Sequence, residues 1–258
     1  MATIEIGGRP HAVTTGKDTA TRVWDLTTGE CRRVLGGGSE RVSAARSWTP
    51  VVATVLIEGR PHAVTTSRDH VVRVWNLETG ECRYSLSGHT QWVSAVTTAE
   101  INGHPHAITL GDDRTARVWD LRRGECRHVL AGHREALSGA TTAEIDGRPH
   151  LITTSDDFTA RVWDPETGEC RHILAGHTKW VCTATAIRID GRPHVVTTGN
   201  DRTMRVWDLE TGLERDVLHL PHAAYAATAT PGPTATVVLG VGTDVIVIQP
   251  NPDRTWFD

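Results

Sequence analysis

The sequence predicts an all-β fold assembled from repeated antiparallel sheets, and two observations support this prediction. First, Arg-Val-Trp occurs five times, each time with an Asp six positions before the Trp. The five tryptophans are spaced by 51, 44, 44 and 44 residues. A fixed period of about 40–45 residues is typical of blade-type repeat architectures. Second, each repeat divides into short β-type segments and shows no helical period. The five tryptophans are Trp24, Trp75, Trp119, Trp163 and Trp207.

The repeat over residues 132–174 shows best why four strands are expected in each unit. Turns are predicted at residues 146–149, 155–157 and 165–168, because Asp-Gly, Pro and clustered Asp residues end regular structure. A four-stranded unit cannot bury its apolar faces alone, so the repeats are expected to pack into one array. The apolar, Thr-rich and alternating segments favour strands at Leu137–Ile145, His150–Thr154, Thr159–Trp163 and Cys170–Leu174.

Composition and charge exclude several classes of protein. The chain has 258 residues, of which 38% are hydrophobic and 22% charged, and its net charge of −4 gives no basic field for nucleic acid or an anionic membrane. No run approaches the roughly 18 apolar residues of a membrane span, and the first residues lack the features of a signal peptide. We therefore expect a cytoplasmic protein that binds neither nucleic acid nor membrane.

Four of the five cysteines recur at one repeat position, inside Gly-Glu-Cys-Arg. Equivalent positions in successive sheets are expected to lie beyond the ~7 Å Cα separation that a disulfide allows. Metal ligation would need closely spaced pairs. We interpret the cysteines as small, semi-buried strand residues, with no metal and no cofactor. The four are Cys31, Cys82, Cys126 and Cys170, and Cys182 stands apart from them.

Gly132-His133 at the start of the repeat, Trp163-Asp164 near its end and four strands between them resemble the WD-repeat family of β-propellers. The resemblance covers five units and most of the chain, although the second unit carries Asn76 in place of Asp and Gly37-Gly38 in place of Gly-His. It implies a single ring of four-stranded blades. Six blades are predicted, approximately at residues 1–35, 36–86, 87–130, 131–174, 175–218 and 219–258.

The Gly-Arg-Pro-His turns and the Thr-rich strands look like those of actinobacterial WD-repeat proteins. In those bacterial proteins, such rings often accompany kinase or nucleotide-binding signalling domains. The resemblance therefore implies a sensor or scaffold whose activity depends on a partner.

The last unit is expected to be degenerate, because it has neither Trp-Asp nor the turn Asp. In the family, a ring usually closes when one terminus donates a strand to the blade that holds the other. Here Arg254–Phe257 could supply an outer strand, closure could be weak, or the chain could be a fragment of a larger ring. We favour six blades closed without the usual exchange. The strands expected in the last unit are Ala223–Thr230, Thr234–Gly240 and Val245–Gln249.

The resemblance also implies a hydrogen-bonded chain in which a His bridges the turn Asp and a strand Thr, and the indole N–H joins it. The Thr lies four positions before the Asp in all five copies. A His, a hydroxyl and an Asp also suggest a catalytic triad, but a set that recurs favours structure, and no catalytic residue is assigned. The expected sets are His89, Thr109, Asp113 and Trp119; His133, Thr153, Asp157 and Trp163; and His177, Thr197, Asp201 and Trp207.

A second series of histidines ends the Gly-Arg-Pro-His turns and their relatives. Zinc–nitrogen bonds of about 2.0–2.1 Å need converging side chains, and equivalent positions in separate blades do not converge. We predict turn residues on one face rather than a metal site. The series is His11, His62, His106, His150 and His194.

Specificity is expected where the side chain changes from one repeat to the next. The family resemblance places two such positions on one rim around the central channel, and aromatic residues beside mixed charges are typical of binding hot spots. The alternative is that Trp92 and Trp180 only pack against neighbouring loops. The first series is Arg41, Trp92, Ala136, Trp180 and Tyr225, three residues after the Gly-His histidine. The second, just before the turn Asp, is Lys17, Arg68, Asp112, Asp156 and Asn200.

Three functions remain open. We favour a non-catalytic scaffold that binds a protein or peptide at the rim, with no prediction of oligomeric state. A small-molecule or glycan-binding propeller would repeat its contact residues in every blade, whereas the rim residues vary. An enzyme would need one unrepeated site at the channel mouth. Its only candidates are Cys182, His219, His222 and Tyr225.

Overall fold

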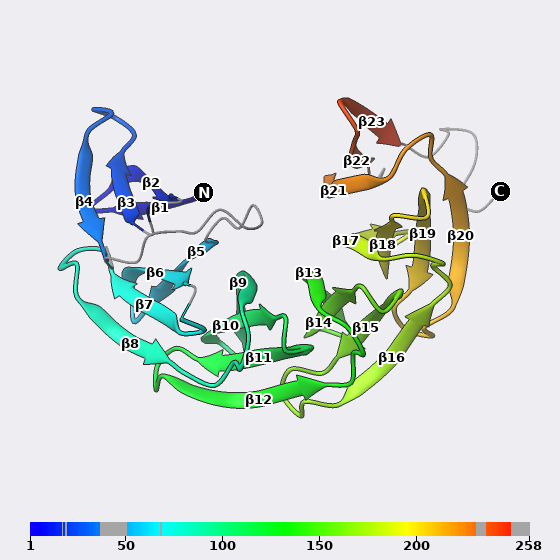
Figure 1. Ribbon diagram of the computed structural model, residues 1–258, viewed down its shortest axis with the longest axis horizontal. Coiled ribbons are helices and arrows are strands. Elements are labelled where there is room, and N and C mark those ends of the chain that lie inside the picture. Colours follow the sequence, from blue (N-terminus) through cyan, green and yellow to red (C-terminus); the bar gives the residue numbers. More distant parts are fainter. Residues whose placement is uncertain (17, 19, 37–50, 68, 231–235, 249–258) are drawn as a thin grey trace. The chain divides into compact units, whose positions relative to one another are not determined.

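The structure, a computed structural model, describes residues 1–16, 18, 20–36, 51–67, 69–230 and 236–248. These residues form six β-sheets and no helix (Figure 1). Each sheet is a meander in which strands adjacent in sequence are neighbours. The all-β prediction with six sheets is confirmed. Lys17, Arg41 and Arg68 of the predicted rim lie outside the described residues.

The chain forms two compact units, and each is described by itself. The first unit comprises Met1–Asp113 and Arg117–Val129, and the second comprises Arg114–Ala116 and Leu130–Asp258. The first sheet contains β1 (Ala2–Ile6), β2 (Arg9–Thr15), β3 (Thr21–Asp25) and β4 (Cys31–Leu35). The second contains β5 (Val52–Ile57), β6 (Arg60–Thr66), β7 (Val72–Asn76) and β8 (Cys82–Leu86). The third contains β9 (Val93–Ile101), β10 (His104–Gly111), β11 (Thr115–Asp120) and β12 (Glu125–Ala131).

The second unit holds the other three sheets. The fourth sheet contains β13 (Leu137–Ile145), β14 (Arg148–Ser155), β15 (Thr159–Trp163) and β16 (Cys170–Ala175). The fifth contains β17 (Val181–Ile189), β18 (Arg192–Gly199), β19 (Thr203–Asp208) and β20 (Glu214–His219). The sixth contains β21 (Ala224–Thr230), β22 (Thr236–Val241) and β23 (Asp244–Ile248). The last sheet is therefore three-stranded in the described residues, and the outer strand considered at Arg254–Phe257 lies outside them.

The first turn of each repeat is shorter than the sequence suggested. In the fourth sheet, Asp146 and Gly147 alone form the turn, with φ angles of 53° and 73°. Two consecutive positive φ angles match the twist of a two-residue hairpin, so the strands pair as far as Ile145 and Arg148. The predicted four-residue turn over 146–149 is wrong, because Arg148 and Pro149 belong to β14.

The core of each unit lies between neighbouring sheets. Val64 and Val74 of the second sheet pack in one buried cluster with Val93 and Trp119 of the third. In the second unit, Ile152 of the fourth sheet is clustered in the same way with residues of the fifth. A single sheet leaves one apolar face exposed, so burial of this kind requires the next repeat.

Threonine hydroxyls on the first or second strand of a sheet join it to the innermost strand of a neighbouring sheet. Thr54 Oγ1 on β5 donates to the carbonyl of Thr3 on β1 at 3.0 Å, and Thr98 Oγ1 on β9 donates to the carbonyl of Thr54 at 3.1 Å. In the second unit, Thr198 Oγ1 donates to the carbonyl of Ala224 at 2.7 Å. These bonds explain why the strands are rich in Thr, because a Thr hydroxyl can donate to a carbonyl of the neighbouring sheet and an apolar side chain cannot.

The recurring cysteines are exposed, so their predicted semi-buried state is wrong. Each lies in the outermost strand of its sheet, β4, β8, β12 or β16, which has a neighbouring strand on one side only. Cys182, on the innermost strand β17, is only partly exposed. In the part of the chain that the structure describes, no helix is long and apolar enough to cross a membrane.

Candidate functional site

The hydrogen-bonded chain expected in three repeats is present in all three. In the third sheet, Trp119 Nε1 donates to Thr109 Oγ1 at 2.8 Å, and His89 Nε2 lies 2.7 Å from the same oxygen. His89 Nδ1 lies 2.8 Å from Asp113 Oδ2. The fourth and fifth sheets repeat these contacts at 2.8–2.9 Å and 2.8–3.1 Å respectively.

The direction of this chain follows from what each atom can donate. The indole N–H only donates, so it occupies an acceptor position of the Thr109 hydroxyl. The one hydroxyl proton is then available for His89 Nε2, and the proton of the neutral ring sits on Nδ1, facing the Asp113 carboxylate. Every donor in the chain has an acceptor, as buried polar groups require.

The carboxylate at the end of the chain also fixes the surrounding turns. Asp201 accepts the backbone N–H of Thr178 at 2.9 Å and the Thr203 hydroxyl at 2.8 Å. Burial acts to raise the pKa of Asp201, but these donors and His177 outweigh it and hold the pKa below its usual range. The Asp therefore ties the loop that carries the His to the turn that precedes β19.

Burial lowers the pKa of His89 and His177, although the facing Asp113 and Asp201 carboxylates act in the opposite direction. Burial also lowers the pKa of His106. The neutral ring is the form that the folded protein favours at these positions.

The glycine of Gly-His leaves room for an arginine. Arg117 lies over the Trp119 ring at 6.0 Å from its centroid. A Cβ atom at Gly88 would meet the Arg117 guanidinium at 2.7 Å and the Trp119 ring at 3.4 Å. Gly132 has the same relation to Arg161. The Gly therefore permits the Arg of Arg-Val-Trp to stack on the tryptophan beside it.

In the first two sheets the turn Asp makes a different contact. Trp24 and Trp75 still donate to Thr14 and Thr65, at 2.8 and 2.9 Å. Asp18 pairs instead with Arg22 of Arg-Val-Trp, and the Asp18 side chain is 52% exposed, against 6% for Asp113. In these sheets the turn carboxylate thus pairs with the Arg of Arg-Val-Trp and stays at the surface.

The Asp of Trp-Asp closes the last turn of the repeat. Asp25 accepts the backbone N–H groups of Thr27 and Thr28 at 2.8 and 3.2 Å. Asn76 does the same through Oδ1, at 2.9 and 3.1 Å from the next two equivalent nitrogens. An amide oxygen accepts as a carboxylate oxygen does, which accounts for Asn76 in the second sheet.

The Gly-Arg-Pro-His histidines are buried strand residues, so the prediction that they are turn residues is wrong. His106 on β10 is 0% exposed, and its Nδ1 lies 2.9 Å from the carbonyl of His104. Because the two-residue turn is short, the position after Pro already faces inward. All five rings make this contact with the residue two positions before. Among the described residues, no group of side chains is placed to hold a metal ion.

The predicted rim positions meet at one end of each sheet, which we call the loop face. It comprises Trp92 and Asp112 in the first unit, and Ala136, Asp156, Trp180, Asn200 and Tyr225 in the second. The backbone N–H of Asp112 donates to the carbonyl of Trp92 at 2.8 Å, and Asn200 donates to Trp180 in the same way at 2.8 Å. The two series therefore lie side by side within a sheet.

Tyr225 does not occupy the position first expected for it. In the fifth sheet Val181 pairs with Gly199 and Thr183 with Thr198, and Cys182 is the extra residue of a β-bulge. In the sixth sheet Ala224 and Ala226 pair in the same way, so Tyr225 corresponds to Cys182. The register predicted for Tyr225 is wrong by two residues. It still reaches the loop face, since its hydroxyl donates to Asn200 Oδ1 at 3.0 Å.

The aromatic residues of the loop face are exposed. Trp92 is 36%, Trp180 54% and Tyr225 65% exposed. Phe158, in the turn before β15, is 42% exposed and was not predicted. Its repeat equivalents are Arg114 and Arg202, so comparing this third variable position between repeats would have identified it.

Three segments of the chain match the family model described as WD domain, G-beta repeat: residues 80–120, 124–164 and 168–208. Each segment joins the outermost strand of one sheet to the three inner strands of the next. Sheets three to five therefore carry repeats of the WD type, in agreement with their hydrogen-bonded chains.

Two relatives match part of the chain. Protein tipD of Dictyostelium discoideum is 33% identical over 76 residues, which are 30% of this chain and 11% of that protein. Nuclear distribution protein nudF of Emericella nidulans is 30% identical over 79 residues, 31% of this chain and 16% of that protein. The chain thus matches only a small share of either relative.

Replacing Trp119 by Ala should lower the free energy of unfolding by about 3–5 kcal/mol, because a nearly fully buried indole and its bond to Thr109 are lost. Trp75→Ala in the same unit is the matched control and should cost less, since the Trp75 side chain is only partly buried. Denaturant unfolding followed by circular dichroism measures both. Equal losses would contradict the role given to the buried chain.

Acid should destabilise the protein between about pH 7 and 5. His89, His106 and His177 have a lower pKa folded than unfolded, so the unfolded chain binds more protons as pH falls through about 6.5. Stability is therefore full above that pH and decreases below it. Unfolding midpoints measured across this range should fall, and His177→Gln should make the decline shallower. A midpoint that stays constant would refute the assignment.

Proposed function

We propose that this protein is a non-catalytic interaction module that binds a protein or peptide through its loop face. Repeats of the matched family typically mediate protein–protein interaction. The proposal includes the sequence prediction that the six sheets form one propeller, in which the loop face surrounds the central channel. The cytoplasmic location and the likeness to actinobacterial WD-repeat proteins also belong to the proposal.

The observation that carries the proposal is the exposed group formed by Trp180, Asn200 and Tyr225. Trp180 and Asn200 are joined through the backbone, and Asn200 accepts the Tyr225 hydroxyl. The Tyr225 side chain is thus held by a hydrogen bond beside the Trp180 backbone, and both aromatic residues have more than half of their surface in solvent. Rigid exposed aromatic residues are the usual centre of binding hot spots.

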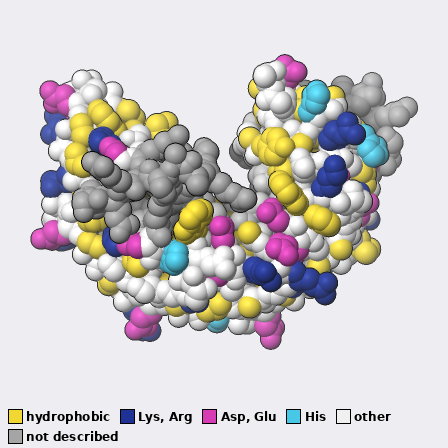
Figure 2. Space-filling model, viewed as in Figure 1, with side chains coloured by type: hydrophobic (Ala, Val, Ile, Leu, Met, Phe, Trp, Pro, Cys, Tyr) yellow, Lys and Arg dark blue, Asp and Glu magenta, His cyan; other side chains and the backbone are white. Residues whose placement is uncertain are grey.

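Acidic groups near these aromatic residues favour a basic partner segment. Burial raises the pKa of the Cys182 thiol to about 11, and the carboxylates of Asp156 and Asp201 act in the same direction. Asp201 is held in its hydrogen-bonded chain, so Asp156 is the carboxylate that belongs to the loop face of the second unit. Over the region of β13 and β17, hydrophobic side chains lie next to acidic ones (Figure 2). A Lys or Arg side chain can pair with a carboxylate and stack on an indole at the same time.

The raised pKa of Cys182 also bears on the enzyme alternative. A thiol with a pKa of about 11 is protonated near neutral pH, and the thiolate is the nucleophilic form. Cys182, the only cysteine among the unrepeated candidates, is therefore poorly suited to covalent catalysis. This supports binding over catalysis at the loop face.

A peptide library probed with the full chain tests the proposal. The wild-type protein should select segments rich in Lys or Arg, and the Trp180→Ala/Tyr225→Ala variant should bind them at least about tenfold more weakly. Leu213→Ala is the control, because Leu213 is 61% exposed in the turn at the other end of the fifth sheet. Unchanged selection by the folded double variant would refute the loop-face assignment.

A further inference from the structure

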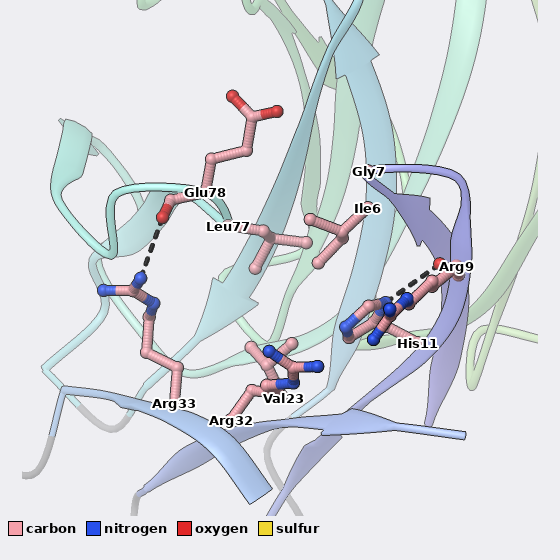
Figure 3. Close-up of a pocket in the computed structure, with 9 residues that line it drawn as sticks. All are labelled: Ile6, Gly7, Arg9, His11, Val23, Arg32, Arg33, Leu77 and Glu78. Atoms are coloured by element: carbon pink, nitrogen blue, oxygen red, sulfur yellow. Dashed lines mark hydrogen bonds between the residues drawn. The ribbon is translucent and has the colours of Figure 1, made fainter. Parts of the chain in front are cut away.

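A second site candidate lies at the opposite end of the sheets from the loop face. Within the first unit, a cavity of about 670 Å³ opens beside the β1–β2 hairpin and the turn that follows β7 (Figure 3). Its size is within the range of small-molecule sites. It is lined by Ile6, Gly7, Arg9, His11, Val23, Arg32, Arg33, Leu77 and Glu78.

Three arginines line this cavity. Arg33 lies at one end and Arg9 at the other, with Arg32 between them (Figure 3). Arg32 Nη2 is 2.8 Å from Asp25 Oδ2, whereas Arg9 Nη1 is 3.8 Å from the same oxygen, beyond hydrogen-bond length. The Arg9 side chain is 59% exposed, so its guanidinium can reach a ligand.

The charge of Arg33 is not cancelled by a carboxylate bond. Its two terminal nitrogens donate to the carbonyls of Thr79 and Glu78, at 2.6 and 2.8 Å. The Glu78 carboxylate extends away from Arg9 and Arg32 (Figure 3). Three arginines face two acidic residues, Asp25 and Glu78, and the cavity keeps a net positive charge of one.

Arg33 is peculiar to the first repeat. The equivalent residue in the second sheet is Tyr84, whose hydroxyl donates to the carbonyl of Arg122 in the next sheet at 2.7 Å. Tyr84 thus makes the same inter-sheet contact without a charge. The contact alone does not need an arginine, and the added charge is available for binding.

The fourth sheet provides an internal comparison. Its equivalent cavity is about 300 Å³, and Arg148 and Arg171 there face Asp146 and Asp164. The two positive and the two negative side chains leave this cavity with no net charge. The first-sheet cavity therefore differs from its repeat equivalent in both size and net charge.

We propose that the first-sheet cavity binds a small organic anion, whose carboxylate or phosphate group pairs with Arg9 and Arg32. Guanidinium groups bind both oxyanions through charge-assisted hydrogen bonds. The apolar part of the ligand packs against Ile6 and Leu77, which lie on the other side of the cavity from Arg32 (Figure 3). This site is independent of the loop face.

Calorimetric titration of the full chain with phenyl phosphate, benzoate and benzyl alcohol tests the proposal. Saturable binding of either anion, with none of the uncharged alcohol, is expected, and the stronger anion identifies the preferred oxyanion. Equal binding of the alcohol, or no binding of either anion, overturns the proposal.

Variants locate the site. Arg9→Gln should weaken anion binding about tenfold, because it removes a charge-assisted bond. Arg33→Tyr retains the inter-sheet contact made by Tyr84 and should weaken binding about threefold. Arg148→Gln, the repeat equivalent of Arg9→Gln, should leave binding unchanged. An equal loss in Arg9→Gln and Arg148→Gln would overturn the assignment to this cavity.

Discussion

The buried Thr hydroxyl between an indole and an imidazole is the interaction on which the rest of the structure depends. Thr109 accepts from Trp119 and faces His89, and His89 in turn reaches Asp113. One chain thus connects the second and third strands of a sheet to the loop that enters it. Because each member satisfies the next, a polar network is tolerated where an unpaired group would be costly.

This network was predictable from the sequence because its members recur at fixed spacing. The Thr four positions before the turn Asp is the one that bonds to the indole and faces the imidazole. The sequence did not predict features that depend on one or two residues of backbone geometry, such as a bulge or the exact length of a turn. The bulge at Tyr225 shifted its register, and the two-residue turns carried the Gly-Arg-Pro-His histidines into the strands. Local backbone geometry, rather than side-chain pattern, decides such positions.

Comparing the repeats distinguishes residues that hold the fold together from residues that can give one sheet its own binding properties. The residues of the hydrogen-bonded chain are alike in three sheets, whereas the loop face changes from Ala136 to Trp180 at one position. At the other end of the sheets, Arg33 donates to a carbonyl of the next sheet through its guanidinium, whereas the equivalent Tyr84 does so through its hydroxyl. Both ends thus hold side chains that the fold alone does not require, and a rigid framework can present each of them independently.

Nitrogen NMR of the labelled histidine rings tests the central network most directly. If the carboxylate accepts from Nδ1 and the Thr hydroxyl donates to Nε2, His89 and His177 at about neutral pH carry their proton on Nδ1 and leave Nε2 unprotonated. The Asp113→Ala variant should then allow the His89 ring to exchange between tautomers, since Nδ1 loses the carboxylate that accepts its proton. Protonation on Nε2 in the wild-type protein would contradict the network.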